Sequence, residues 1–341
     1  MLNKVNWLQD FADAISIDKR GIRWYDEVVL RKEISLNALG EERYYEEIQS
    51  DIANILYRFY YTIGEPVLVG TLNSLTTNFG NRDFTDMLHS YNSGHGRIDD
   101  EWIFNGQADL LGEIVRVRKF GLQISVPVSQ VECWDPKNKP DVGSTVRVML
   151  PAASFGRSPG FYYAHSDLAP DYAFPISRIY FNVNPTFGGP LVKFLTTRLN
   201  EELIPFDFKI CKNFRDYYRS DVSVLYTERT SLDKIARVID SDLIHMVKKG
   251  WFRKKRPAMT FAVSEGIGIA DSPEDGDSFG QHRCKLIASG ILGSIKDSGK
   301  RERTRSIMET FRESGLDPAR PYLNNSEDDI YKRIFSHEVS T

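Results

Sequence analysis

The stretch from Ser158 to Arg229 constrains the fold more than any other part of the sequence, because its hydrophobic period changes from alternation to a helical repeat and back. Apolar residues first alternate, then recur at helical spacing after Pro190, and alternate again beyond Pro205. This order predicts a strand, a helix, a strand and a strand. In residues 178–184 the polar side chains share one face of the predicted strand and the apolar side chains share the other.

The strand predicted over residues 206–211 places a lysine on a polar sheet face. Its phenylalanine and isoleucine residues occupy alternate positions, so they should point into the core. Asp207 and Lys209 should therefore point away from that core.

Composition excludes several classes of protein. With 341 residues and 41% hydrophobic content, the chain can bury a large core and divide into two or three domains. A net charge of −3 argues against a general nucleic-acid binder. Cys133, Cys211 and Cys284 are odd in number and far apart, which is not typical of a disulfide framework or a zinc site. We find no signal-peptide pattern and no apolar run of about eighteen residues, and therefore expect a cytoplasmic protein without a membrane segment.

The whole pattern predicts an α+β fold in three parts. We expect an N-terminal helical region over residues 1–100 and a small antiparallel β region over 101–155, where short alternating runs are separated by turn residues. The remaining residues, 156–341, should form a mixed sheet-and-helix core that carries the site. The oligomeric state is left open.

Helical spacing elsewhere predicts further helices. The strongest candidates are residues 40–63 and 231–250, each ended by a glycine, and shorter helices are expected over 5–15 and 84–91. Glycine and aspartate in residues 92–102 indicate a loop.

Two cationic segments offer anion sites. Ser278 followed by Gln281 fits a capping box, so a helix should begin there, and Arg283 in its first turns could complete an anion site. Alternatively, Ser278 only caps the helix and Arg283 pairs with a nearby acid. The run 248–256 holds six Lys or Arg in nine residues; it is either a solvated face or a docking site for an acidic or phosphate-bearing partner.

The absence of familiar motifs in the sequence narrows the chemistry. It contains no GxxxxGK[ST], no GxGxxG after a strand, no HExxH and no GxSxG, which weakens the NTPase, dehydrogenase, zinc-protease and serine-hydrolase interpretations. We expect no metal and no cofactor.

A lysine on a sheet face together with arginines suits metal-free elimination of phosphate. Lys209 would remove the Cα proton of a phosphoserine or phosphothreonine, with its pKa depressed by neighbouring cations. Arginines would hold the phosphate, and His165 or a tyrosine would protonate it. Alternatively, Lys209 is a surface lysine and His165 is a satisfied histidine at a strand end.

Six segments spread over about residues 90–293 occur in the order found in a known family: NSGHGRIDDEW, SPGFYYAHSD, RIYFNVN, LNEELIPFDFKI, YRSDVSVLYTER and SFGQHRCKLIA. They resemble the HopA-type family. That family includes type III secretion effectors and the HopA-like lyases of class V lanthipeptide and thioamitide gene clusters.

The resemblance implies a site and partners. It implies a lysine base at Lys209 and phosphate-binding arginines at Arg178, Arg219 and Arg283, and it supports the elimination chemistry. The substrate would be a precursor peptide phosphorylated by a separate kinase. The resemblance does not extend to the acid, for which the residues themselves suggest His165, with Tyr226 or Tyr162 as substitutes. The residues expected to support the site are Tyr162, Tyr180 and Lys212.

Two function classes stay open. One is a phosphopeptide lyase in peptide maturation, and the other is a HopA-like effector or a protein that binds phosphopeptides without turnover. A helix that begins by about residue 5, in place of a polar tail, favours the resident enzyme.

Overall fold

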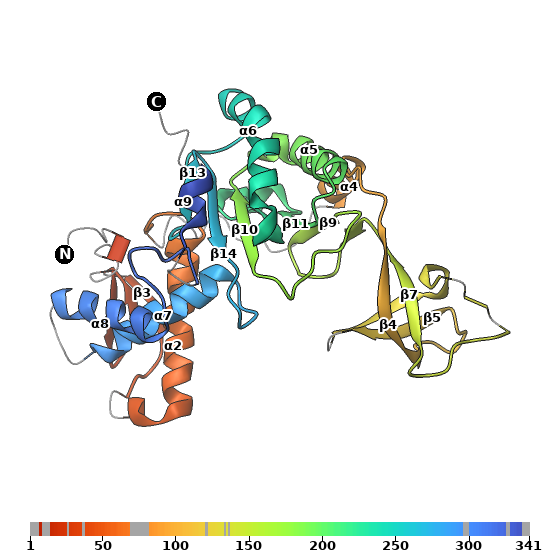
Figure 1. The fold of residues 1–341 in the computed structure, drawn as a ribbon. Helices are drawn as coiled ribbons and strands as arrows, with labels where there is room; N and C mark the ends of the chain where they lie inside the picture. The colour runs from red at the N-terminus through yellow and green to blue at the C-terminus, as the bar shows by residue number, and fades with distance from the viewer. Residues whose placement is uncertain are drawn as a thin grey trace.

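Three antiparallel sheets with helices packed on them form an α+β fold, as predicted (Figure 1). The computed structural model describes residues 7–8, 14–25, 27–35, 38–68, 82–119, 122–132, 134–135, 137–295, 300–324 and 328–335.

The largest sheet has seven strands in the order β13-β14-β10-β12-β11-β9-β8, and every neighbouring pair is antiparallel. Its strands are β8 (Ala153–Ser154), β9 (Phe161–His165), β10 (Ile176–Phe181), β11 (Phe206–Cys211), β12 (Ser223–Glu228), β13 (Phe261–Ser264) and β14 (Ile267–Asp271). The strand predicted over residues 206–211 is confirmed at both ends. The strand predicted from residue 178 begins two residues earlier and ends at Phe181.

Two helices cover one face of this sheet, α5 (Gly188–Glu201) and α6 (Leu232–Lys248) (Figure 1). The apolar residues of α5 recur at helical spacing, and Leu191, Leu195 and Leu199 are buried against the strands. Both predicted helices are thus confirmed. The opposite face of the sheet carries polar side chains, and its Tyr180, Val224 and Ala270 pack into the core that also holds Leu56 and Ile287.

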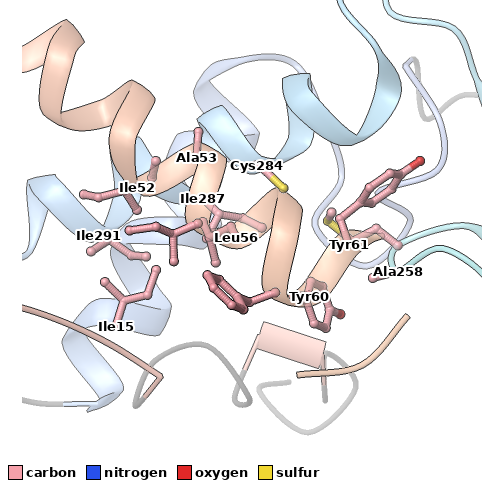
Figure 2. Packing of buried hydrophobic residues seen from close by; sticks show 14 of the residues in the cluster. Ile15, Ile52, Ala53, Leu56, Tyr60, Tyr61, Ala258, Cys284, Ile287 and Ile291 are labelled. Atoms are coloured by element: carbon pink, nitrogen blue, oxygen red, sulfur yellow. The ribbon is translucent and has the colours of Figure 1, made fainter. Parts of the chain in front are cut away.

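The N-terminal and C-terminal parts of the chain share one core. The long helix predicted from residue 40 is confirmed as α2 (Glu42–Leu56), which continues into a π-helical turn at Tyr57–Tyr61. It packs against α7 (Phe279–Gly293), and Figure 2 shows side chains of both helices interleaved around Leu56 and Ile287. The next helix, α8 (Lys300–Glu313), packs against α7.

Close contact between these elements requires glycine at one position of α7. A Cβ atom on Gly280 would lie 2.2–2.6 Å from ring atoms of Tyr61. Because such distances are far inside van der Waals contact, only glycine allows the π-helical turn to approach the start of α7.

The sequence analysis missed a three-stranded sheet near the N-terminus. Its strands are β1 (Ile15–Asp18), β2 (Gly21–Trp24) and β3 (Glu27–Arg31). The helix predicted over residues 5–15 lies mostly outside the described residues, and its last residue, Ile15, is wrong because it belongs to a strand. Strands of four or five residues carry too few periods to be recognised from alternation.

The small antiparallel sheet predicted after residue 101 is confirmed, in the order β6-β5-β4-β7. Its strands are β4 (Arg97–Gln107), β5 (Ile114–Lys119), β6 (Leu122–Pro127) and β7 (Thr145–Leu150), and they have a core of their own and project away from the other elements (Figure 1). The loop predicted over residues 92–102 is too long, because β4 begins at Arg97 and pairs with β7.

The remaining elements are short. The helix predicted near residues 84–91 is confirmed as α4 (Arg82–Ser90), and α9 (Ile330–Phe335) lies close to α6. Short 3₁₀ turns lie at Ala38–Gly40, Val128–Gln130, Pro185–Phe187, Phe214–Tyr218 and Arg229–Ser231. Cys211 and Cys284 are buried free thiols, and Cys133 lies outside the described residues.

Candidate functional site

Two rows of side chains cross the face of the central sheet opposite α5 and α6, which we call the polar face. The members of each row lie directly opposite one another on β9, β11, β12 and β10. The first row is His165, Asp207, Tyr226 and Arg178, and the second is Tyr163, Lys209, Val224 and Tyr180. Since residues two apart on a strand share a face, the antiparallel pairing brings together five of the predicted site residues: Lys209, His165, Tyr226, Arg178 and Tyr180.

Lys209 is surrounded by aromatic rings. Its Nζ lies 4.8 Å from the ring centroid of Phe161 and 5.5 Å from that of Tyr226. Aromatic faces stabilise an ammonium group. Burial alone would lower the pKa of Lys209, but interactions with Tyr226 and Tyr163 outweigh it and hold that pKa above its ordinary value.

This finding corrects the expectation that cations depress the pKa of Lys209. The groups around its ammonium that govern the pKa are tyrosines rather than arginines. In this structure Lys209 is therefore a cation at neutral pH.

His165 is held by a buried carboxylate. Its Nδ1 lies 2.6 Å from Oδ1 of Asp207, and its Nε2 lies 2.9 Å from Oγ of Ser154. Asp207 also accepts hydrogen bonds from the Arg157 guanidinium, at 3.0 Å, and from the hydroxyl of Tyr172. Burial alone would raise the pKa of Asp207, but His165 and Arg157 favour the charged form and hold that pKa well below its ordinary value.

Arg178 is anchored within the protein. Its guanidinium donates to Oγ of Ser272 at 3.1 and 2.9 Å and to the carbonyl of Asp277 at 2.9 Å, and it lies 5.3 Å from the ring centroid of Tyr226. Only 7% of Arg178 is exposed. Arg178 lies on the polar face, as predicted, and its guanidinium N–H groups already donate to Ser272 and Asp277.

Arg219 is paired with an acid two residues further along the chain. Its Nε and one terminal nitrogen each donate to Asp221 at 2.8 Å, and the same terminal nitrogen donates to the hydroxyl of Tyr57 at 3.4 Å. The side chain remains 23% exposed. Such a bidentate pair is strong, so a phosphate at Arg219 would compete with Asp221.

Arg283 is not part of the polar face. Ser278 caps α7 as predicted, with its Oγ accepting the N–H of Gln281 at 3.2 Å. The Arg283 guanidinium, however, is fully buried and donates to the carbonyls of Pro321 and Leu323 at 2.7 and 3.0 Å. Burial lowers its pKa to about 10. In the structure the Arg283 guanidinium holds the C-terminal segment, and Tyr180 and Arg178 of the polar face are among its electrostatic neighbours.

The other predicted supporting residues lie apart from Lys209. Tyr162 points to the opposite face of the sheet, where it is fully buried and accepts a hydrogen bond from Asn92 at 2.9 Å, because its position in β9 alternates with that of Tyr163. Burial raises its pKa to about 12. The Lys212 ammonium follows β11 and donates to the carbonyl of Phe155 at 3.1 Å.

The basic run 248–256 is partly built into the fold. Arg253 donates to the Asn182 side chain at 2.6 Å and to the Arg219 carbonyl at 2.8 Å, and Lys255 pairs with Glu65 at 2.5 Å. The interpretation of this run as a solvated face therefore holds only for its exposed lysines.

Sequence reasoning missed Asp207 as a partner of His165, as well as Ser154 and Arg157 beside them. The signal for Asp207 was its position two residues before Lys209, which puts both side chains on one face. Nothing in the sequence indicates that β9, and not another strand, pairs with β11.

Two properties concern the described part of the chain as a whole. It contains no group of three or more His, Cys, Asp or Glu side chains suited to holding a metal ion. None of its helices has both the length and the apolar character needed to cross a membrane.

Comparisons with known proteins connect these segments to a family. The structure of the effector protein from Pseudomonas syringae pv. tomato strain DC3000 is similar with a TM-score of 0.44 and 16% identity, covering 82% of this chain and 97% of that chain. The structure of the effector protein from Pseudomonas syringae pv. syringae strain 61 gives 0.40 and 14%, covering 83% and 97%. Among curated proteins no match is found. The sequence profile of the HopA1 effector protein family matches residues 153–323, half of the chain and the whole of the polar face, and the protein therefore belongs to that family.

Proposed function

We propose that the polar face is the active site of a metal-free lyase that eliminates phosphate from phosphoserine or phosphothreonine in a peptide. The observation that carries this proposal is the placement of Lys209 and His165 on one face of the paired strands β11 and β9, diagonal to each other. Diagonal neighbours of this kind lie about 7 Å apart, a distance that one phosphorylated residue can span.

The two residues have complementary roles. The Nζ of Lys209, as the free amine, takes the Cα proton, and the electrons of that C–H bond form the Cα=Cβ double bond. The Cβ–O bond breaks, and phosphate leaves with the former side-chain oxygen. His165, as the imidazolium, protonates the departing phosphate through Nε2, which lies 2.9 Å from Oγ of Ser154, since its Nδ1 faces Asp207. The product is a dehydroalanine or dehydrobutyrine residue.

Phosphate would contact the accessible arginines. Arg157, with half of its side chain exposed, is bound to the carboxylate that holds His165, and Arg219 is partly exposed at the other end of the face. The resemblance to HopA-like lyases supports this chemistry and a substrate phosphorylated by a separate kinase, as in lanthipeptide-type maturation.

A second candidate is a protein that binds phosphopeptides without turnover, as an effector of the same family could. The raised pKa of Lys209 favours it, because a lysine that stays protonated binds an anion but removes no proton. The two candidates differ in whether the Cβ–O bond breaks.

Mass spectrometry of phosphothreonine and phosphoserine peptides incubated with the protein tests the proposal. Elimination predicts a product that has lost phosphoric acid and carries a dehydro residue. Lys209→Met should reduce the rate by at least ~100-fold. The matched control is Lys193→Met, which removes an exposed lysine on α5, beyond the opposite face.

Binding of the same peptides, measured by fluorescence anisotropy, separates the two candidates. If the wild-type protein binds the phosphopeptides and leaves them intact at every pH tested, the lyase is wrong and the binding protein stands. If Lys209→Met releases phosphate as fast as the wild type, Lys209 is not the base.

A further inference from the structure

We propose that Ser154, His165 and Asp207 form a nucleophilic centre that transfers acyl groups from carboxylic esters. This activity is distinct from the elimination proposed above and uses a serine that the elimination does not need. The three residues come from adjacent strands β8, β9 and β11, at the edge of the central sheet.

The atoms lie in the order that serine nucleophiles require. Oγ of Ser154 is 2.9 Å from Nε2 of His165, and Nδ1 of His165 is 2.6 Å from Oδ1 of Asp207. Both distances are within hydrogen-bonding range, and the base is oriented by the acid through its other nitrogen. Such centres are recognised by geometry and by role, and the order of the residues in the chain varies between folds.

The acid of this centre is fixed and charged. Asp207 is 2% exposed and is held by the Arg157 guanidinium and the Tyr172 hydroxyl as well as by His165. With a carboxylate at Nδ1, we assign the proton of the neutral imidazole to that nitrogen, which leaves Nε2 to accept the serine proton.

The nucleophile is accessible, and a cation lies beside it. Ser154 ends the two-residue edge strand β8, is itself partly exposed, and precedes the exposed residues 155–157. The Lys212 ammonium donates to the carbonyl of Phe155 at 3.1 Å, which places a positive charge at the backbone of the residue that follows the serine. That charge can stabilise the oxyanion that forms when Ser154 attacks a carbonyl carbon.

Exposed apolar side chains near this centre indicate the substrate class. Phe155 follows the serine and is 45% exposed, and Tyr172, whose hydroxyl contacts Asp207, is 53% exposed as a whole residue. Leu168 and Phe174, in the same loop as Tyr172, are 43% and 52% exposed. Apolar surface of this kind suits esters with apolar acyl or aromatic groups.

The reaction balances with water as the only co-substrate. Ser154 Oγ attacks the ester carbonyl carbon while His165 Nε2 takes the hydroxyl proton, and the alcohol leaves with that proton. Water then attacks the acyl-serine, His165 again accepts and returns a proton, and the carboxylic acid leaves. The GxSxG motif, which this sequence lacks, is typical of a serine on a sharp turn between a strand and a helix. Ser154 lies on an edge strand, so the lack of that motif does not argue against this centre.

A fluorophosphonate with an apolar alkyl chain tests the serine directly, because the nucleophile displaces fluoride and keeps the phosphonate. The expected result is one adduct per protein molecule, located on Ser154 by peptide mapping, together with hydrolysis of p-nitrophenyl butyrate. Ser154→Ala should abolish both. Ser158→Ala is the matched control, since it removes a serine of the same loop whose Oγ contacts only the neighbouring Pro159 carbonyl among the described groups, and it should label as the wild type does.

The base and the acid are tested separately. His165→Gln should slow labelling by at least ~100-fold, and Asp207→Asn by a comparable factor through the wrong tautomer. Because Asp207 also holds Arg157 and Tyr172, the Asp207→Asn variant must first be shown by circular dichroism to be folded. If that variant is not folded, the labelling rate of His165→Gln decides the test. No adduct on wild-type Ser154, or equal labelling rates for wild type and His165→Gln, overturns the proposal. The experiment contains no phosphopeptide, so its failure leaves the proposed elimination untouched.

Discussion

Asp207 and His165 lie opposite each other on β11 and β9, and their side chains meet at 2.6 Å with only 3% of the aspartate and 12% of the histidine exposed. A second aspartate and histidine, Asp167 and His95, meet at 2.9 Å with 29% and 86% exposed. The chain thus contains the same aspartate–histidine pair in a buried and in an exposed setting.

Replacing Asp207 with Asn should destabilise the protein by ~3–5 kcal/mol at pH 7, because it removes the partner of a buried His165 and of Arg157. Asp167→Asn is the matched control, and it should change the free energy of unfolding little, since exposed pairs are weak. Urea unfolding followed by circular dichroism measures both. Equal effects of the two substitutions would show that Asp207 is not an anchor.

Lowering the pH should reduce the free energy of unfolding by protonating the Asp207 carboxylate. The pKa of Asp207 is lowered in the folded state, so its contribution to stability is present above its unfolded pKa of about 3.9 and is lost as pH falls toward the folded value. Asp207→Asn should therefore flatten the fall of the free energy of unfolding below about pH 4. A variant whose stability falls as steeply as that of the wild type over this range would contradict the assignment.

Replacing Arg283 with Ala should lower stability rather than phosphate affinity. The buried guanidinium satisfies the carbonyls of Pro321 and Leu323, and leaving such acceptors without a donor costs ~1–3 kcal/mol. Thermal unfolding and phosphopeptide affinity should be measured on the same sample. Lys285→Ala, which removes an exposed lysine of the same helix, is the control.

Loss of phosphopeptide affinity in a stable Arg283→Ala protein would restore the phosphate site expected from the sequence. Unchanged thermal stability would show that the C-terminal segment does not depend on Arg283.

The long periodic elements of the fold could be predicted from the sequence, and the short ones could not. Helices α2, α5 and α6 each carry several turns of apolar spacing, and β11 carries a full alternation. The strands of the N-terminal sheet are four or five residues long, and a glycine and exposed side chains interrupt their pattern. Their strand character depends on pairing with one another, which local spacing does not show.

The site was predictable in its parts but not in its arrangement. Alternation placed Lys209 and Arg178 on polar faces of their strands. Which strands are neighbours depends on the crossovers through α5 and α6, so the contact of His165 with Asp207 could not be read from spacing. For Arg283, a helix N-terminus favours anions in general, whereas its guanidinium donates to the carbonyls of Pro321 and Leu323, a contact between distant segments that local spacing does not show.

Tyr226→Phe should alter the pH dependence of phosphate elimination, because the Tyr226 hydroxyl helps to hold the pKa of Lys209 high. Without that hydroxyl the rising limb of the pH–rate profile should move to lower pH. Tyr162→Phe is the control on the opposite face of the same sheet and should leave the profile unchanged. Complete loss of turnover in Tyr226→Phe with binding intact would instead assign the general acid to Tyr226.

The wild-type pH profile tests the protonation state of Lys209 most directly. Its pKa is raised, so at neutral pH nearly all of the side chain is ammonium, and the fraction of free amine grows about tenfold per pH unit. If Lys209 removes the Cα proton, kcat should rise with pH through neutrality and continue to rise to the highest pH at which the protein stays folded. Initial rates of phosphate release, with folding checked by circular dichroism at each pH, give this profile. A plateau near neutral pH would mean that a bound phosphopeptide has changed the surroundings of Lys209, or that another group is the base. The profile of Lys209→Met separates these outcomes, since only a different base leaves a plateau in the variant.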